Sequence, residues 1–137
     1  MLLISREPRQ ILGFRVGTSV NEKIIQELAD GCPQGKNYYT DGCPTYAAVY
    51  FGSGNHYPNP NNKKDTHIVE SINSDLRRYL AVLHRKSKCF VRKSDTLKAI
   101  LSIFINAYNK YNEEKMEWHK YHKDYKGDYG FYIVDFL

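Results

Sequence analysis

The sequence has few cysteines, no long apolar run and no internal repeat. Its three cysteines, Cys32, Cys43 and Cys89, are widely spaced and form neither a CxxC pair nor an even set. This spacing argues against a disulfide scaffold and against a cysteine-rich zinc module. No apolar run reaches the roughly 18 residues that a membrane span needs, and residues 1–5 are too short for a signal peptide. We therefore expect a cytoplasmic protein with no membrane partner.

The length and composition are those of one ordinary globular domain. A chain of 137 residues is long enough to bury a single core. Hydrophobic residues make up 42% and charged residues 26% of the chain, which is close to the usual composition of folded domains. Composition alone therefore leaves the function open.

Positive charge is concentrated in residues 77–98. Eight basic residues against one acid, Asp95, give this segment a net charge of +7. The whole chain carries +5, so the remainder carries −2. Such a patch favours a polyanionic partner, because neutralised phosphates drive sequence-independent DNA binding, although a solvated basic surface explains the charge equally well. The basic residues are Arg77, Arg78, Arg85, Lys86, Lys88, Arg92, Lys93 and Lys98.

The first half of the chain mixes strands and helices. Leu2 to Ile4 and Ile11 to Gly17 read as two strands joined by a turn, which predicts a hairpin. Val20 to Ala29 has helical spacing and stops at an Asp-Gly pair. A short strand, Asn37 to Thr40, follows, and Pro44 suits the first turn of a helix that we expect to reach Phe51.

The second half is mostly helical. We expect a loop over residues 52–65 with a short strand near His56. Thr66 suits the cap of a long helix over residues 68–83, and a second long helix follows Ser94. From Asn112 we expect a polar, aromatic tail that is separate from the domain of residues 1–111. The predicted class is α/β or α+β.

Two acidic residues are candidates for a site. Asp41 follows a predicted strand immediately before a glycine, at the edge where open α/β sheets place ligand-binding side chains. A simple turn aspartate explains the Asp-Gly pair equally well. Glu70, Asn73 and Arg77 lie on one helix stripe, roughly 90° from the stripe of leucine, isoleucine and valine residues. From spacing alone, a surface glutamate is the simpler interpretation of Glu70.

This set of residue types suits phosphodiester chemistry. Two Mg²⁺ ions about 3.5–4 Å apart activate the attacking oxygen and stabilise the leaving one. Hard cations prefer carboxylate oxygens and keep several water ligands, so few protein ligands are enough. Arg77 could hold a phosphate, since its guanidinium matches phosphate oxygens.

The order of these residues resembles the DDE transposases of small bacterial and archaeal insertion sequences, most of all the family typified by insertion sequence one. The resemblance covers about residues 11–111, and its most specific part begins at Thr66 and ends at Ser87. The matching motifs and residues, in chain order, are Tyr39-Thr40-Asp41-Gly42 with Pro44 and Tyr46, His56, Thr66-x-x-x-Glu70-x-x-Asn73-x-x-Leu76-Arg77, Leu80-Ala81-x-Leu83-x-Arg85-Lys86-Ser87, Phe90 and Ser94.

The resemblance implies a ribonuclease-H-like mixed sheet with flanking helices and a metal site of three carboxylates. The family's second aspartate falls on Asp41, its glutamate on Glu70 and its DNA-contacting basic residue on Arg77. Asn73 matches a recurrent position and is expected to support the ligands. The family uses Mg²⁺, for which Mn²⁺ substitutes, to cut transposon ends and join them to target DNA.

Two departures from the family limit this expectation. The family's first aspartate lies on a strand before the hairpin, and the only acid upstream of Ile11 is Glu7, in a turn beside Pro8. The N-terminal region that finds transposon ends is absent too. The segment of residues 90–94 is also one residue longer than the corresponding motif of the family. We therefore expect a sheet with its first strand missing, and a chain that is inactive alone.

The sequence thus supports two hypotheses. The first is a transposase catalytic-domain fragment that acts on transposon ends and target DNA. The second is a non-catalytic DNA-binding regulator that works through the basic segment, residues 77–98. Partners in either case are DNA and, through the open sheet edge, a second copy or a full-length transposase.

Weaker signals are present in the aromatic and histidine residues. His119 and His122, with Glu117 and Asp124 nearby, lack the further ligands of a zinc site and read better as an exposed polar tail. The tyrosines between residues 38 and 50 could stack on bases, but core and turn packing is the better explanation.

Overall fold

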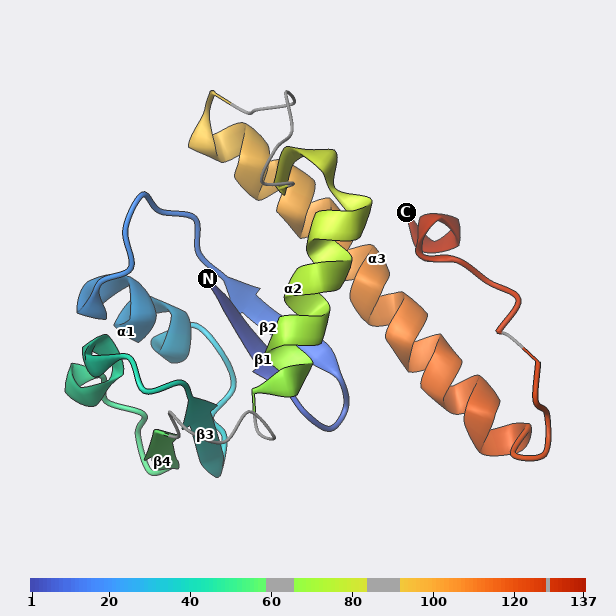
Figure 1. Cartoon of the computed structure of the whole chain (residues 1–137), viewed down its shortest axis with the longest axis horizontal. Coiled ribbons are helices and arrows are strands. Elements are labelled where there is room, and N and C mark those ends of the chain that lie inside the picture. Colours follow the sequence, from blue (N-terminus) through green and yellow to red (C-terminus); the bar gives the residue numbers. More distant parts are fainter. Residues whose placement is uncertain (59–65, 84–91, 128) are drawn as a thin grey trace.

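The computed structural model describes residues 1–58, 66–83, 92–127 and 129–137. In these ranges the chain is mixed α/β, with three α-helices, two small sheets and short 3₁₀ turns (Figure 1). The elements are β1 (Leu2–Ser5), β2 (Gln10–Phe14), α1 (Glu22–Asp30), β3 (Asn37–Thr40), η1 (Pro44–Ala48), β4 (Asn55–Pro58), α2 (His67–Tyr79), η2 (Ala81–Leu83), α3 (Ser94–Tyr121) and η3 (Ile133–Phe136).

The predicted hairpin is confirmed, with a bulge that the sequence did not reveal. Strands β1 and β2 pair antiparallel, and the register shifts between Leu3, opposite Gly13, and Ile4, opposite Ile11. Leu12 is left without an opposite residue, so the side-chain alternation of β2 is reset at this point. Ile11 and Phe14 therefore both contact the main core although they are three residues apart.

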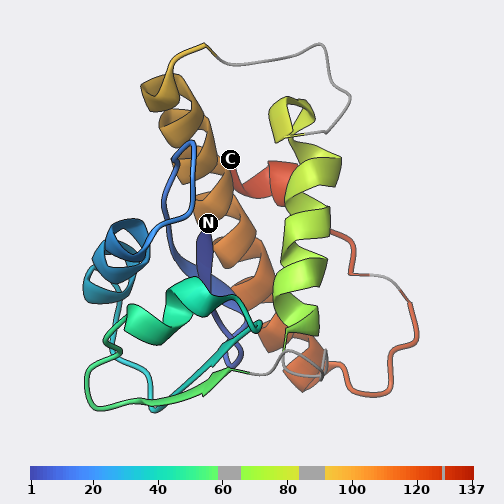
Figure 2. The same cartoon turned by 60° about the vertical axis from the view of Figure 1, so that its left-hand side comes forward.

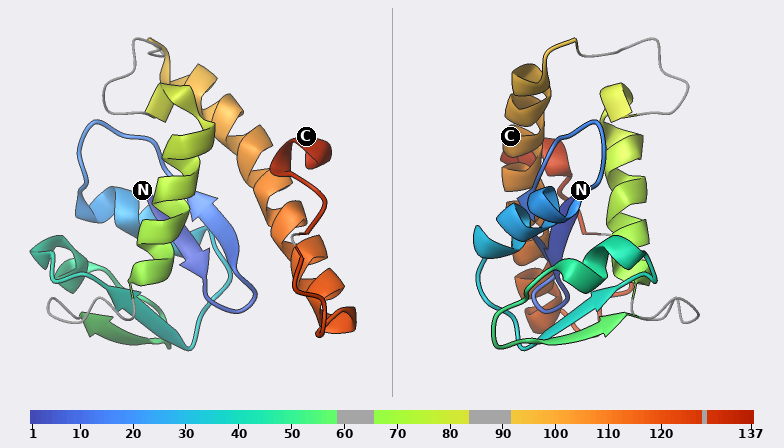
Figure 3. Two further views of the ribbon diagram at one scale, coloured as in Figure 1. Left: turned by 45° about the vertical axis from the view of Figure 1, so that its right-hand side comes forward. Right: turned by 90° about the vertical axis from the view of Figure 1, so that its left-hand side faces the viewer.

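Helices cover both faces of the hairpin. One face packs against α2 and α3, where Ile72 is fully buried and Leu76 is 4% exposed. On the other face Gly13 approaches α1 so closely that a Cβ would lie 3.0 Å from Leu28 Cδ1. The turned views show α1 and α2 on opposite sides of the two strands (Figures 2 and 3).

The second sheet is a separate two-stranded parallel pair, β3 and β4. It has its own small core, in which Tyr38 of β3 packs with Ile25 of α1 and with Phe51. The first helix, α1, forms as predicted, and Asn21 caps it by accepting a hydrogen bond from the N–H of Ile24 at 3.0 Å. The four strands thus form two pairs and no continuous sheet in the described residues.

Two predicted helices are shorter in the structure. The helix from Pro44 ends as a 3₁₀ turn at Ala48, because Val49 turns extended and buries its side chain. Helix α2 ends at Tyr79, where Leu80 adopts an extended backbone before the short turn η2. Leu80 and Leu83 nevertheless still pack against the main core, as the apolar stripe over residues 69–83 predicts. Thr66 precedes α2 without making a side-chain capping bond.

The predicted tail from Asn112 is wrong in its first ten residues. Helix α3 continues without a break to Tyr121. Residues 112–121 contain no glycine or proline and are rich in Glu, Lys and Met, which favour helix. The segment after the helix then folds back, and Ile133 of η3 is buried in the main core.

No helix in the described part of the chain combines the length and the apolar character that crossing a membrane requires.

Candidate metal and nucleic-acid site

Asp41 lies at the end of β3, as predicted, and also makes the turn that the simpler interpretation expected. It directly follows Thr40, the last residue of the strand, and is exposed. Its Oδ1 accepts a hydrogen bond from the N–H of Cys43 at 3.2 Å. This bond orients one carboxylate oxygen and leaves the other facing solvent, so a turn role and a ligand role are compatible.

Two aromatic residues define the surroundings of Asp41. Burial raises the pKa of the Tyr46 phenol, and the negative charge of Asp41 raises it further. His56 Nε2 lies 2.8 Å from Thr40 Oγ1, and its ring packs 4.7 Å from the Phe51 ring. Burial lowers the pKa of His56, so its imidazole is neutral near pH 7. The end of β3 therefore combines one carboxylate with neutral hydrogen-bonding groups.

Helix α2 presents the predicted polar residues beside its buried face. Glu70 lies in the first turn and Arg77 in the last, and both are exposed. Asn73 lies between them and is half-buried. Because Ile72 and Leu76 occupy the core side of the helix, the three polar side chains line its margin. The positions on the helix match the expectation.

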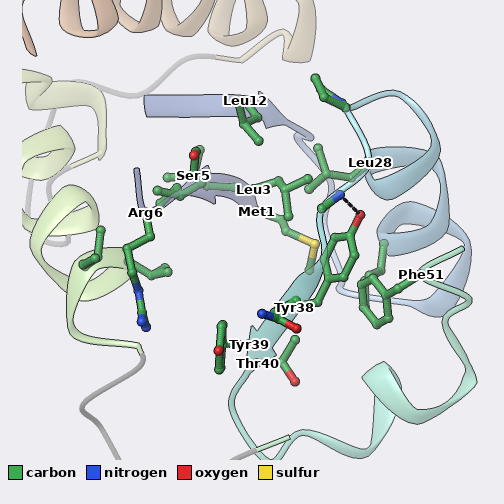
Figure 4. Close-up of a pocket in the computed structure, with 18 of the residues that line it drawn as sticks. Met1, Leu3, Ser5, Arg6, Leu12, Leu28, Tyr38, Tyr39, Thr40 and Phe51 are labelled. Carbon is green, nitrogen blue, oxygen red and sulfur yellow. Dashed lines mark hydrogen bonds between the residues drawn. The ribbon is translucent and has the colours of Figure 1, made fainter. Parts of the chain in front are cut away.

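A cavity lies beside β3 and the first turn of α2. It has a volume of about 460 Å³ and is lined by β1, β3 and residues of α1 and α2 (Figure 4). Thr40 and Val69 are among its lining residues, and Asp41 and Glu70 directly follow them in the chain. The first turn of α2 also lies beside the β3–β4 pair (Figures 1 and 2). Asp41 and Glu70 do not line the cavity themselves, but each directly follows a residue that does, one on β3 and one on α2.

The chemistry of these two groups fits a hard cation only in part. Carboxylate oxygens are the ligands that Mg²⁺ prefers. Among the described residues, however, no three histidine, cysteine or acidic side chains converge on a point where a metal could bind. The described residues thus offer two exposed carboxylates, Asp41 and Glu70, and a three-carboxylate site would need a further donor.

The described basic residues are exposed at the opposite end of α2 from Glu70. Arg77 and Arg78 stand in its last turn, and the Arg78 guanidinium lies 5.8 Å from the Tyr79 ring centre. Arg92 and Lys93 precede α3 and are exposed. Three further candidates of the basic segment lie outside the described residues, namely Arg85, Lys86 and Lys88.

The sequence analysis missed a polar network that joins the hairpin turn to two helices. Arg9 donates from Nη2 to Ser71 Oγ at 2.8 Å and lies 3.7 Å from Asp75 Oδ2. Tyr108 of α3 donates its hydroxyl hydrogen to the same Asp75 oxygen at 3.1 Å. Burial raises the pKa of Tyr108, and Asp75 raises it further. The i,i+4 spacing of Ser71 and Asp75 was the only signal in the sequence.

The weaker candidates remain surface groups in the structure. His122 stacks on Trp118 with ring centres 4.5 Å apart, and His119 lies 5.0 Å from the same ring. Both histidines are exposed, and they belong to no metal-binding group within the described ranges. Of the tyrosines, Tyr38 is core and Tyr50 is 73% exposed.

Comparison with protein-family models, with curated proteins and with solved structures found no match to this chain.

Proposed function

We propose that this chain is part of the catalytic domain of a DDE-type transposase with a ribonuclease-H-like fold. It acts on transposon ends and target DNA, holds Mg²⁺ through Asp41 and Glu70, and lacks one of the three carboxylates that the family uses. The family activity is cleavage and joining of DNA strands, and we expect activity only when a third carboxylate joins Asp41 and Glu70.

One observation carries the proposal. Asp41 at the end of a strand and Glu70 in the first turn of a helix are 29 positions apart in sequence, yet each follows a residue that lines the same cavity. Both side chains are exposed, so substrate and solvent have access to them. The residues next to both acids thus border one cavity, and this is the basis for proposing that the two carboxylates act together.

The remaining site residues have roles that follow from their chemistry. Bound Mg²⁺ would stabilise negative charge on the phosphate oxygens at which strands are cut and joined. Arg77 lies two helical turns after Glu70 and would bind a neighbouring phosphate, because its guanidinium pairs with two oxygens. Asn73 lies between the two and would hold water or a ligand oxygen by hydrogen bonds. The basic residues beyond Arg77 would follow the DNA backbone.

Strand transfer is the experiment that tests the proposal. Labelled element ends are incubated with plasmid DNA and Mg²⁺ or Mn²⁺, using this chain, its Glu70→Gln variant and a Glu22→Gln control. Glu22 is an exposed glutamate in the first turn of α1, and it neither lines the cavity nor directly follows a lining residue. We expect joined product only when a second chain supplies a carboxylate, and we expect Glu70→Gln to lower it at least 100-fold while Glu22→Gln leaves it unchanged.

Joining that survives Glu70→Gln would contradict the assignment of Glu70 as a ligand. A metal titration provides a readout that does not depend on the DNA ends. Paramagnetic Mn²⁺ should broaden the amide signals near Asp41 and Glu70 first, and either Asp41→Asn or Glu70→Gln should weaken that broadening. Broadening confined to the acidic residues of α3 would argue for non-specific ion binding.

A non-catalytic DNA-binding regulator is the second candidate. The observation that favours it is the exposure of Arg77, Arg78, Arg92 and Lys93 at the ends of α2 and α3, without a third acid beside Asp41 and Glu70 in the described residues. No joining under any condition, together with salt-sensitive retention of DNA by both the parent and Glu70→Gln, would select this candidate. Loss of a phosphate contact should reduce the salt slope by about 0.9 per residue removed.

A further inference from the structure

The cavity between the two sheets is bordered by two strand edges that face each other. Strand β1 is paired with β2 on one side only, and β3 is paired with β4 on one side only. Residues 2–5 of β1 and 37–40 of β3 all line the cavity. No backbone hydrogen bond joins β1 to β3 within the part of the chain that the structure describes.

The hydrogen-bond pattern of the hairpin shows which groups of β1 are open. Met1 and Arg15 exchange both backbone bonds, at 2.9 and 3.0 Å. Bonded pairs alternate along antiparallel strands, so Leu3 faces β2, and the N–H and C=O groups of Leu2 and Ile4 face the other way. Ile11, which lies opposite Ile4, agrees with this alternation. Its backbone N–H and C=O bond to the side chain of Asn109 and therefore point away from β1.

The same reasoning applies to β3. The N–H of Asn55 donates to the carbonyl of Lys36 at 2.8 Å. The backbone groups of Lys36, and of Tyr38 and Thr40 at alternate positions after it, therefore point toward β4. The backbone groups of Asn37 and Tyr39 therefore face away from β4. Both residues line the cavity. Two residues on each edge thus present unpaired peptide groups to one gap.

The walls of the gap are apolar on both sides of the plane of the strands. Ile25 and Leu28 of α1 lie on one side, and Ile68 and Val69 of α2 on the other. Figure 4 shows side chains of β1, α1 and β3 around the opening. A strand buried on both faces is typically a continuous apolar run. Arg6, just after β1, stacks over the Tyr39 ring at 4.9 Å and links the two edges.

We propose that an extended, apolar segment of another polypeptide binds in this gap as a strand, with backbone hydrogen bonds to β1 on one side and to β3 on the other. A compact ligand could fill the volume but could not satisfy two parallel rows of peptide groups, whereas an added strand does so by its own backbone. The inserted strand would join the two pairs into one five-stranded sheet. The inference goes beyond the proposed function, because strand binding requires neither metal nor DNA.

A peptide titration tests the inference. The probe is the acetylated and amidated peptide Lys-Val-Ile-Val-Ile-Val-Lys, added to the ¹⁵N-labelled full chain. Its matched control carries N-methyl groups on alternate residues, which removes the donors toward one edge and keeps every side chain. We expect saturable binding that is at least tenfold weaker for the N-methylated peptide.

Amide hydrogen exchange locates the binding. The amides of Leu2, Ile4, Asn37 and Tyr39 should exchange at least tenfold more slowly with peptide, whereas Tyr38, already bonded within its pair, should be unchanged. Equal affinity for both peptides, protection outside these four amides, or no binding by either peptide would each overturn the proposal.

A pair of variants at one exposed position checks the role of the backbone. Asn37→Pro removes a single N–H that faces the gap and leaves the β3–β4 bonds in place. Asn37→Ala removes the side chain and retains the N–H. We expect Asn37→Pro to weaken binding about fivefold, the effect of one net hydrogen bond, and Asn37→Ala to bind like the parent. Equal affinities for the two variants would contradict a backbone contact at β3.

Discussion

Gly13 is the residue at which the hairpin and α1 approach most closely. An added Cβ would lie 2.5 Å from Cys32 Sγ and 3.0 Å from Leu28 Cδ1. Glycine is needed here for the close approach of two elements, since the contact rather than the backbone conformation excludes a side chain. Nothing in the local sequence marks this requirement, because Cys32 is 19 positions away.

We predict that Gly13→Ala lowers the free energy of unfolding by roughly 1–3 kcal/mol, the usual cost of overpacking. Chemical denaturation followed by circular dichroism measures it. Gly130→Ala is the matched control, because a Cβ there meets nothing within 4 Å. Adding Cys32→Ala to Gly13→Ala should recover part of the loss. A neutral Gly13→Ala would show that the hairpin and α1 are further apart than the structure places them.

The site residues show how far single positions could be predicted. Asp41 was found because a strand pattern ends directly before it, and Glu70 because helical spacing places it beside the apolar stripe. Both signals are local. The Arg9–Asp75 contact was not found, because it joins residues 66 positions apart and only folding brings them together.

At the scale of elements, Asn109 joins α3 to the outer edge of the hairpin. Its Oδ1 accepts from the N–H of Ile11, and its Nδ2 donates to the carbonyl of Ile11, both at 2.9 Å. One side-chain amide thus does for β2 what a neighbouring strand would do. The open edge of β1, on the other side of the hairpin, has no such partner among the described hydrogen bonds to its backbone.

We predict that Asn109→Leu destabilises the fold by about 1–3 kcal/mol, since it leaves two part-buried backbone groups without partners. Asn106→Leu, at an exposed position on the same helix, is the control and should have little effect. Thermal or urea unfolding measures both. Faster amide exchange at Ile11 in Asn109→Leu alone would place the effect at this contact, and equal destabilisation by the two variants would refute it.

Element type was more predictable than element length. The hairpin, α1, β3 and β4 were predicted from periodicity, turn residues and strand-forming residues. The ends of α2 and α3 were not predicted. Helix α2 ends at Tyr79, earlier than its apolar period indicated, and α3 continues past Asn112 because its residues favour helix and no glycine or proline follows until Gly127.

At the scale of the whole molecule, the protein has two small hydrophobic cores, and the cavity between the two sheets is bordered by the unpaired edges of β1 and β3. The main core gathers the hairpin, α2, α3 and η3, and the second gathers α1, β3 and residues 49–51. Unpaired edges of this kind invite pairing with another chain. Self-association is therefore the expected behaviour of the isolated chain.

We predict that the melting temperature rises with protein concentration, because association stabilises the folded state by mass action. Differential scanning calorimetry over a 50-fold concentration range, with light scattering for the mass, measures it. Leu3→Lys, which places a charge on the β1 edge, should weaken the dependence. A cooperative melt that is independent of concentration, from a monomer, would refute the prediction.

Local sequence determined the kinds of elements, the exposed ends that bear Asp41 and Glu70, and the concentration of positive charge in residues 77–98. These features depend on period, turn chemistry and charge, which neighbouring residues determine by themselves. Tertiary structure alone decided the bulge at Leu12 and the separation of the strands into two pairs around a cavity. Each of those depends on contacts between residues far apart in the chain, which only the packing of both cores brings together.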